Sequence, residues 1–231
     1  MVSALTGLLL GLVLGMRHAF EPDHLAAVST LMASGRGAAR GALLGAFWGV
    51  GHTLSLFGVG LALALLGAQL PPRLADVFEL GVAFMLLGLG GQSLWRAWKQ
   101  GAEGAPQPHH HGEISHLHAG EPDHLHVFRW TLARRPLLVG LVHGLAGSGA
   151  LTALAFATLP TMAARLIYIA LFGIGSIAGM SLLSGLAGVP LSKLGGNRQV
   201  MRALMAATGA VSATLGVFWG RPIAQRLLGS A

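Results

Sequence analysis

Six apolar segments run through this sequence, and each is long enough to cross a lipid bilayer as a helix. They lie at about residues 3–33, 41–68, 76–98, 136–159, 166–191 and 201–228. The hydrocarbon core of a bilayer is roughly 30 Å thick and is crossed by about 20 helical residues. Only 10% of the residues are charged, whereas 53% are hydrophobic, far from the composition of soluble domains. The sequence therefore predicts an all-α integral membrane protein with six transmembrane helices.

Basic residues are divided unevenly between the two sides of the predicted bundle. Ten lie on one side: Arg36, Arg40, Arg96, Lys99, Arg129, Arg134, Arg135, Lys193, Arg198 and Arg202. Four lie on the other: Arg73, Arg165, Arg221 and Arg226. The positive-inside rule then predicts a multi-pass inner (plasma) membrane protein with both termini outside and its longest loop in the cytoplasm. The net charge of +7 does not indicate nucleic-acid binding, because the arginines sit at segment ends rather than on one patch.

Three short patterns recur in the same order in the two halves of the chain. Gly15–His18 parallels Gly140–His143, Ala46–His52 parallels Ala170–Ser176, and Gly81–Leu89 parallels Gly209–Val217, at offsets of 125, 124 and 128. Halves of three spans each have opposite orientations, and inverted repeats with a site between them are a transporter architecture. The predicted domains are a three-helix repeat (1–99), a loop (100–134) and a second repeat (135–231). A chance likeness between glycine-rich helices is the alternative.

The first apolar segment carries a polar run, residues 17–24, near its middle. Ionisable groups at that depth cost about 2.5 to 3.5 kcal/mol each and usually face a cavity. Pro22 lacks the N–H that would bond the carbonyl of His18, and its ring clashes with that carbonyl, so the helix is predicted to break there. In a regular helix His18 and His24 would point about 240° apart. The break lets both imidazoles, Asp23 and the freed His18 carbonyl face one point, unless it is merely a proline kink.

Two further histidines are predicted at membrane depth. His52 lies in the second segment, and the hydroxyls of Thr53 and Ser55 beside it are further candidate oxygens. His143 lies in the fourth segment, just before the flexible stretch 144–149. A lone intramembrane histidine is also often a hydrogen-bonded packing residue, and that interpretation of His143 stays open.

The predicted metal ligands are therefore His18, Glu21, Asp23, His24, His52 and His143. Imidazoles with a carboxylate suit Ni²⁺, Co²⁺ and Zn²⁺, whereas Mg²⁺ and Ca²⁺ prefer oxygen ligands. The chain has no cysteine, so no thiolate site is expected. Asp23 balances part of the charge of a dication, and Glu21 or proton exchange balances the rest. No nucleotide-binding loop is present, so we expect a passive or potential-driven carrier. We expect that the protein is not an enzyme and that it binds no cofactor apart from the transported ion.

The loop between the halves is rich in histidine, with seven of the eleven in the chain. Its low hydrophobicity predicts disorder in the absence of metal. Imidazole-rich tracts bind first-row ions, and the predicted loop ligands are His109, His110, His111, His116, His118, Asp123, His124 and His126. A solvated linker is the alternative. Residues 118–125 nearly copy residues 18–25, and we have no physical account of that copy.

The run His18-Ala19-Phe20-Glu21-Pro22-Asp23-His24 resembles the H-x4-D-H signature of the nickel/cobalt transporter (NiCoT) family. Gly51-His52-Thr53-Leu54-Ser55 resembles the next motif of that family, and the chain is similar to its six-span, UreH-like branch. The resemblance implies an ion-recognition site of His18, Asp23, His24 and His52, with Ni²⁺ or Co²⁺ as substrate. It also implies metallochaperones or nickel-enzyme maturation proteins as partners. We expect uptake, but some relatives with a His-rich loop between the halves act in efflux, so efflux by the same site is the alternative.

Two other functions are alternatives to transport, the first being intramembrane proteolysis. A metalloprotease would need H-E-x-x-H on one helix, and this motif is absent from the sequence. Gly147-Ser148-Gly149 resembles the nucleophile site of a rhomboid protease, but no histidine follows His143 to act as its base. A metal sensor or scaffold that binds without transporting is the second alternative. The sequence favours transport of Ni²⁺ or Co²⁺.

Overall fold

The computed structural model describes residues 2–32, 37–102, 109–111, 114–116, 125–127, 130–132, 134–159, 161–194 and 197–229. Its helices are α1 (Val2–His18), α2 (Pro22–Met32), α3 (Ala38–Leu66), α4 (Pro72–Ala102), α5 (Arg134–Thr158), α6 (Met162–Leu194) and α7 (Arg198–Gly229). Four strands of three residues each lie between α4 and α5: β1 (His109–His111), β2 (Ile114–His116), β3 (Leu125–Val127) and β4 (Trp130–Leu132). They pair as two antiparallel hairpins, β1 with β2 and β3 with β4. The predicted helical class is confirmed, and the hairpins are an addition that the sequence did not indicate.

Four helices in the described part of the chain are long and apolar enough to cross a membrane: Ala38–Leu66, Pro72–Lys99, Met162–Leu194 and Arg198–Gly229. The first predicted segment is divided between α1 and α2, each shorter than a bilayer-crossing helix. The fourth predicted segment corresponds to α5, which is 25 residues long and ends one residue earlier, at Thr158. Length and composition thus support a helical membrane protein.

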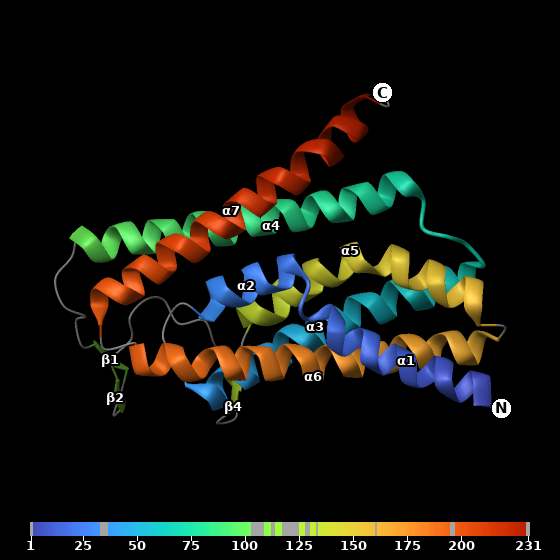
Figure 1. Cartoon of the computed structure of the whole chain (residues 1–231), viewed down its shortest axis with the longest axis horizontal. Helices are drawn as coiled ribbons and strands as arrows, with labels where there is room; N and C mark the ends of the chain where they lie inside the picture. The colour runs from blue at the N-terminus through green and yellow to red at the C-terminus, as the bar shows by residue number, and fades with distance from the viewer. Residues whose placement is uncertain are drawn as a thin grey trace.

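The helices form one bundle in which α4 and α7 lie on one side and α1 and α6 on the other (Figure 1). Helix α4 packs against α7, while α3 packs against both α5 and α6, and α1 packs against α6. The short helix α2 contacts α4, α6 and α7. Ala26, Ala27 and Val28 of α2 are buried in one apolar cluster with Trp48 of α3 and Met180 of α6. The end of the polar motif, from Pro22 to His24, is therefore the first turn of a short helix that is buried among the other helices.

Glycines at the crossings let the backbones touch. A Cβ added to Gly15 of α1 would overlap the carbonyl oxygen of Phe172 in α6. A Cβ added to Gly140 of α5 would overlap the carbonyl oxygen of Trp48 in α3. Small residues at such crossings allow close approach in membranes, where helix association depends on van der Waals packing. These contacts hold α1 against α6 and α5 against α3, and α3 packs on α6 in turn, which brings side chains of α1, α3 and α5 together.

We expect Gly140→Ala to destabilise the protein by about 1 to 3 kcal/mol, the usual cost of overpacking a close-packed interior. The added methyl would push α5 away from α3, because the atom that it meets is backbone rather than a flexible side chain. Gly58→Ala is the matched control, since a Cβ at position 58 meets nothing within 4 Å. Thermal unfolding of the purified variants in detergent measures the difference, and equal midpoints would contradict this account of the packing.

Candidate metal site

The predicted break in the first segment is present. Helix α1 ends at His18 and α2 begins at Pro22. Between them, the N–H of Phe20 donates to the carbonyl of Arg17 at 2.9 Å, and the N–H of Glu21 donates to the carbonyl of His18 at 3.1 Å. The expectation that the His18 carbonyl would be freed for the site is therefore wrong, because the turn that replaces the helix uses it.

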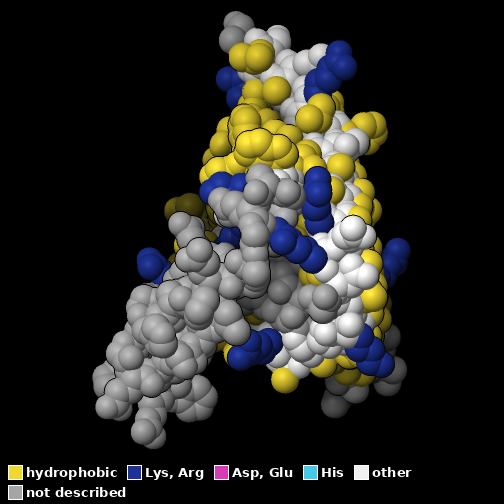
Figure 2. Space-filling view, turned by 90° about the vertical axis from the view of Figure 1, so that its left-hand side faces the viewer, with side chains coloured by type: hydrophobic (Ala, Val, Ile, Leu, Met, Phe, Trp, Pro, Cys, Tyr) yellow, Lys and Arg dark blue, Asp and Glu magenta, His cyan; other side chains and the backbone are white. Residues whose placement is uncertain are grey.

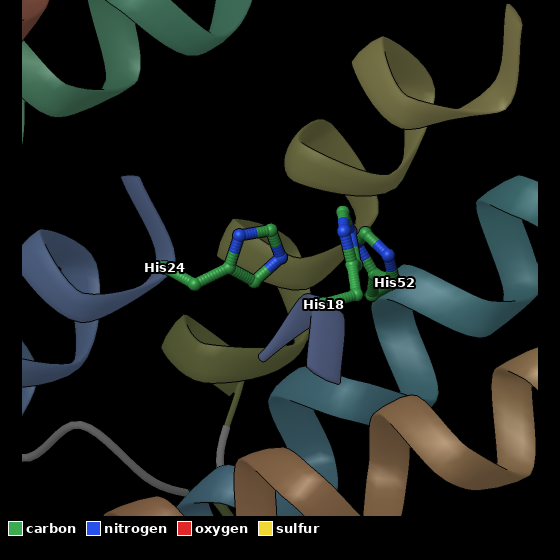
Figure 3. A group of neighbouring side chains, drawn as sticks. All are labelled: His18, His24 and His52. Atoms are coloured by element: carbon green, nitrogen blue, oxygen red, sulfur yellow. The ribbon is translucent and has the colours of Figure 1, made fainter. Parts of the chain in front are cut away.

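Three imidazoles from three helices meet beside this turn (Figure 3). His18 closes α1, His24 lies in the first turn of α2, and His52 lies inside α3. One ring nitrogen from each lies within 4.8 Å of the others. The ring centroid of His18 is 4.4 Å from that of His24 and 5.1 Å from that of His52. Such spacing is suited to three nitrogen ligands of one ion.

A second group of donors shares His24. The carboxylate of Asp23 lies 3.0 Å from Nδ1 of His24 through Oδ1 and 2.7 Å from Nε2 of His143 through Oδ2. Asp23, His24 and His143 also each offer one donor atom within 4.8 Å of the others. The sequence left the position of His143 open, and the fold places its ring 4.0 Å from that of His24. All four histidines of the described side chains thus form one cluster, which we call the histidine cluster: His18, His24, His52 and His143.

Two carboxylates fix which nitrogen faces the inside of the histidine cluster. Glu21 contacts Nδ1 of His18 at 2.9 Å, and Asp23 contacts Nδ1 of His24 at 3.0 Å. An ionised carboxylate only accepts hydrogen bonds, so the Nδ1 atoms carry the protons and the Nε2 atoms keep their lone pairs. This is the carboxylate–histidine arrangement that orients metal-binding imidazoles. Glu21 was predicted as a ligand, but it lies outside both donor groups and its side chain is 53% exposed.

The inward nitrogens are buried without hydrogen bonds. Nε2 of His18, Nε2 of His24, both ring nitrogens of His52 and Nδ1 of His143 have no partner among the described residues. The side chains of His24, His52 and His143 are at most 2% exposed. Each buried polar group without a partner costs about 1 to 3 kcal/mol. Such a concentration of unpaired lone pairs is what a cation with nitrogen ligands would satisfy.

Two aromatic residues that the sequence did not single out form walls of the histidine cluster. Trp48 stacks on His24 with ring centroids 5.4 Å apart and 28° between the planes, and Phe172 lies 5.3 Å from His18. Trp48 precedes His52 by four residues, so helical periodicity could have placed both on one face. Thr53 and Ser55, predicted as further oxygens, instead bond backbone carbonyls. The hydroxyl of Thr53 lies 2.7 Å from the carbonyl oxygen of Gly49 in its own helix and 3.1 Å from that of Gly173 in α6, and Ser55 donates to the carbonyl of Leu141 in α5 at 2.6 Å.

The predicted metal ligands of the loop stay a prediction. His118, Asp123 and His124 lie outside the described residues, as does most of the copied stretch 118–125. The other loop histidines lie in strands whose side chains are not described: His109, His110, His111, His116 and His126.

An α-helical membrane protein with imidazoles and a carboxylate gathered between its helices is the class that the fold and this geometry define. Residues 4–197 match the NicO family, described as high-affinity nickel-transport protein, and the chain belongs to that family. It is also 31% identical over 218 residues to the urease accessory protein UreH of Bacillus sp. (strain TB-90), covering 94% of this chain and 92% of that protein. No solved structure matches the chain. The resemblance drawn from residues 18–24 and 51–55 is therefore confirmed.

Asp23→Ala should lower the stability of the metal-free protein, because it leaves His24 and His143 buried without their shared acceptor. The loss of buried hydrogen-bond partners predicts a cost of about 1 to 3 kcal/mol. Glu21→Ala is the matched carboxylate control, and its half-exposed position predicts a much smaller change. Unfolding with a chelator present tests this, and an Asp23→Ala protein as stable as Glu21→Ala would show that the contacts are not energetically significant.

Proposed function

We propose that this chain carries a divalent first-row cation, Ni²⁺ or Co²⁺, across the membrane through the histidine cluster, in the direction of uptake. The observation that carries this proposal is the set of buried, unpartnered nitrogens on His18, His24 and His52. Membership in a family of nickel-transport proteins supports the substrate class.

In this proposal the three imidazoles are the direct ligands, and the carboxylates act behind them. Glu21 and Asp23 each hold the outer nitrogen of one ligand histidine. Their two negative charges together offset the two positive charges of the ion. His143 is bound to the far oxygen of Asp23 at 2.7 Å and so holds that carboxylate in place. Neutral imidazole nitrogens favour borderline ions over Mg²⁺ and Ca²⁺.

The driving force fits uptake of a dication. A membrane potential contributes about 2.3 kcal/mol per elementary charge per 100 mV, which favours entry of a doubly charged ion into a negative cell interior. Efflux through the same residues is the alternative, and its support is the resemblance to family members that have a His-rich loop.

The name of the similar UreH protein supports a proposed partnership with metallochaperones or nickel-enzyme maturation proteins.

We also propose the six-span inverted repeat. Its support is a reciprocal set of contacts: Gly15 meets the carbonyl of Phe172, and Gly140, 125 residues after Gly15, meets the carbonyl of Trp48, 124 residues before Phe172. The helix pairs follow the same exchange, since α1 packs on α6 as α5 packs on α3.

The last helices of the two halves, α4 and α7, also make a reciprocal pair of hydrogen bonds. The offset between their equivalent residues differs from the one that the sequence pattern suggested. Ser93 donates to the carbonyl of Met205, and Ser212 donates to the carbonyl of Leu86, both at 2.9 Å. Ser93 corresponds to Ser212, and Leu86 corresponds to Met205, each at an offset of 119 residues. The sequence pattern of residues 81–89 and 209–217 gave 128. Glycine-rich patterns allow such a shift, because several alignments of small residues look alike.

The proposed topology places both termini outside and the long loop in the cytoplasm. Figure 2 views the end of the molecule at which α4 ends and α7 begins, and Lys and Arg side chains are spread around it. The helix ends here include Lys99 near the end of α4 and Arg198 at the start of α7, which belong to the predicted side with ten basic residues. The positive-inside rule assigns that side to the cytoplasm.

Single cysteines test this topology cleanly, because the chain has none of its own. Gln69 and Gln199 are exposed and lie near opposite ends of the bundle. On intact cells, a membrane-impermeant maleimide should label Gln69→Cys, whereas Gln199→Cys should react only after the membrane is opened. The reverse pattern would place the long loop outside and refute the assignment.

Transport itself is tested by ⁶³Ni accumulation in cells that express the protein. We expect wild type to raise accumulation and His18→Ala, His24→Ala and His52→Ala each to abolish it. The control is the triple variant of His109, His110 and His111 to alanine, which removes three imidazoles from the loop, more than any single site variant removes, and should still reduce accumulation far less. Lower accumulation with wild type than with empty cells would indicate efflux, and no change for any first-row metal would refute transport.

A further inference from the structure

His18 is enclosed on most sides, and each side has an identified neighbour. Its Nδ1 contacts Glu21, while its ring lies beside those of His24, His52 and Phe172 at centroid distances of 4.4, 5.1 and 5.3 Å. Its side chain is 13% exposed, more than those of the other three members of the histidine cluster. The remaining question is what faces its unpartnered Nε2.

Gly147 of α5 faces this nitrogen. A Cβ added there would lie 3.8 Å from Nε2 and 3.9 Å from Cε1 of His18, and 3.9 Å from Cδ2 of Leu56. These are ordinary van der Waals distances, so packing alone would admit an alanine. Gly144, one turn earlier, is different, because a Cβ there would overlap the carbonyl oxygen of His52. Close packing of the helices explains Gly144 but not Gly147.

The position of a Cβ at residue 147 is at the distance from His18 Nε2 that a water bound to the ion would have. Metal–nitrogen and metal–oxygen bonds at such sites are about 2.0 to 2.2 Å long. A water on an ion held by His18 Nε2 would therefore lie about 3 to 4 Å from that nitrogen, for bond angles from 90° to 180°. The missing methyl at 3.8 Å falls inside this range.

We infer that Gly147 keeps a coordination position open on the ion held by His18, and so sets the preference among metals. This inference rests on the proposed function. Three imidazoles and one water complete the four-coordinate shell of Zn²⁺, whereas six-coordinate Ni²⁺ and Co²⁺ need further water positions beside the three imidazoles. A side chain at 147 removes the water position and moves the preference toward Zn²⁺.

The test compares Gly147→Ala with Gly58→Ala, which adds the same methyl where nothing lies within 4 Å. Calorimetric titration of the full-length protein in detergent measures Ni²⁺ and Zn²⁺ binding separately. Gly147→Ala should weaken Ni²⁺ binding by about 10- to 100-fold, the range seen when groups around metal ligands are altered, and weaken Zn²⁺ binding much less. With Co²⁺, the visible absorption should strengthen toward that of a four-coordinate ion, while the unfolding temperature matches the control.

Gly147→Ser supplies a second variant, because its hydroxyl oxygen can take the place of the water. It should retain more Ni²⁺ affinity than Gly147→Ala does. Equal losses for Ni²⁺ and Zn²⁺, or wild-type binding of both by Gly147→Ala, would overturn the inference while leaving the proposed function intact. If wild type and His18→Ala bind Ni²⁺ alike, the proposed site itself fails, and this inference fails with it.

Discussion

A helix that is interrupted inside a membrane must satisfy its freed backbone groups within the protein, and the rest of this structure depends on how that is done. Water is absent from the bilayer core, so irregular backbone survives there only where protein surrounds it. Here the turn between His18 and Pro22 pairs its own N–H groups with the carbonyls of Arg17 and His18. Because the backbone groups of the turn are hydrogen-bonded within the turn, α2 can run in a different direction from α1. Its first residues then lie in the interior of the bundle.

Backbone contact between helices then brings the remaining histidines of the cluster to this turn. His52 and His143 lie on α3 and α5, and these helices touch where Gly140 passes the carbonyl of Trp48. A larger residue at 140 would separate the two helices and with them the two imidazoles. Glycine also has no side chain at position 147, beside His18. In our inference the glycine at 140 serves close packing of helices, and the glycine at 147 leaves room for a water on the ion.

The histidine cluster combines strong donors with incomplete enclosure. His24 belongs to both donor groups, one with His18 and His52 and the other with Asp23 and His143. His24 therefore links His18 and His52 to the carboxylate of Asp23, which His143 contacts through its other oxygen. The exposed fraction falls from Glu21 through His18 to His24 and His52. A half-exposed carboxylate therefore leads to a buried set of imidazoles.

The sequence by itself determined the helical membrane class and the break at Pro22, together with the gathering of His18, Asp23 and His24 beside it. These features are local: the hydropathy of a segment sets its environment, and a missing N–H acts on a carbonyl four residues away. It also indicated His52, through a motif of the family. Only the tertiary structure decided that His143 meets Asp23, which lies 120 residues away. It also decided that Glu21 lies behind His18 rather than inside the cluster, and that Gly147 faces an open nitrogen. These positions follow from how closely α5 approaches α1 and α3, a distance that depends on the packing of all three helices and that no single stretch of sequence encodes.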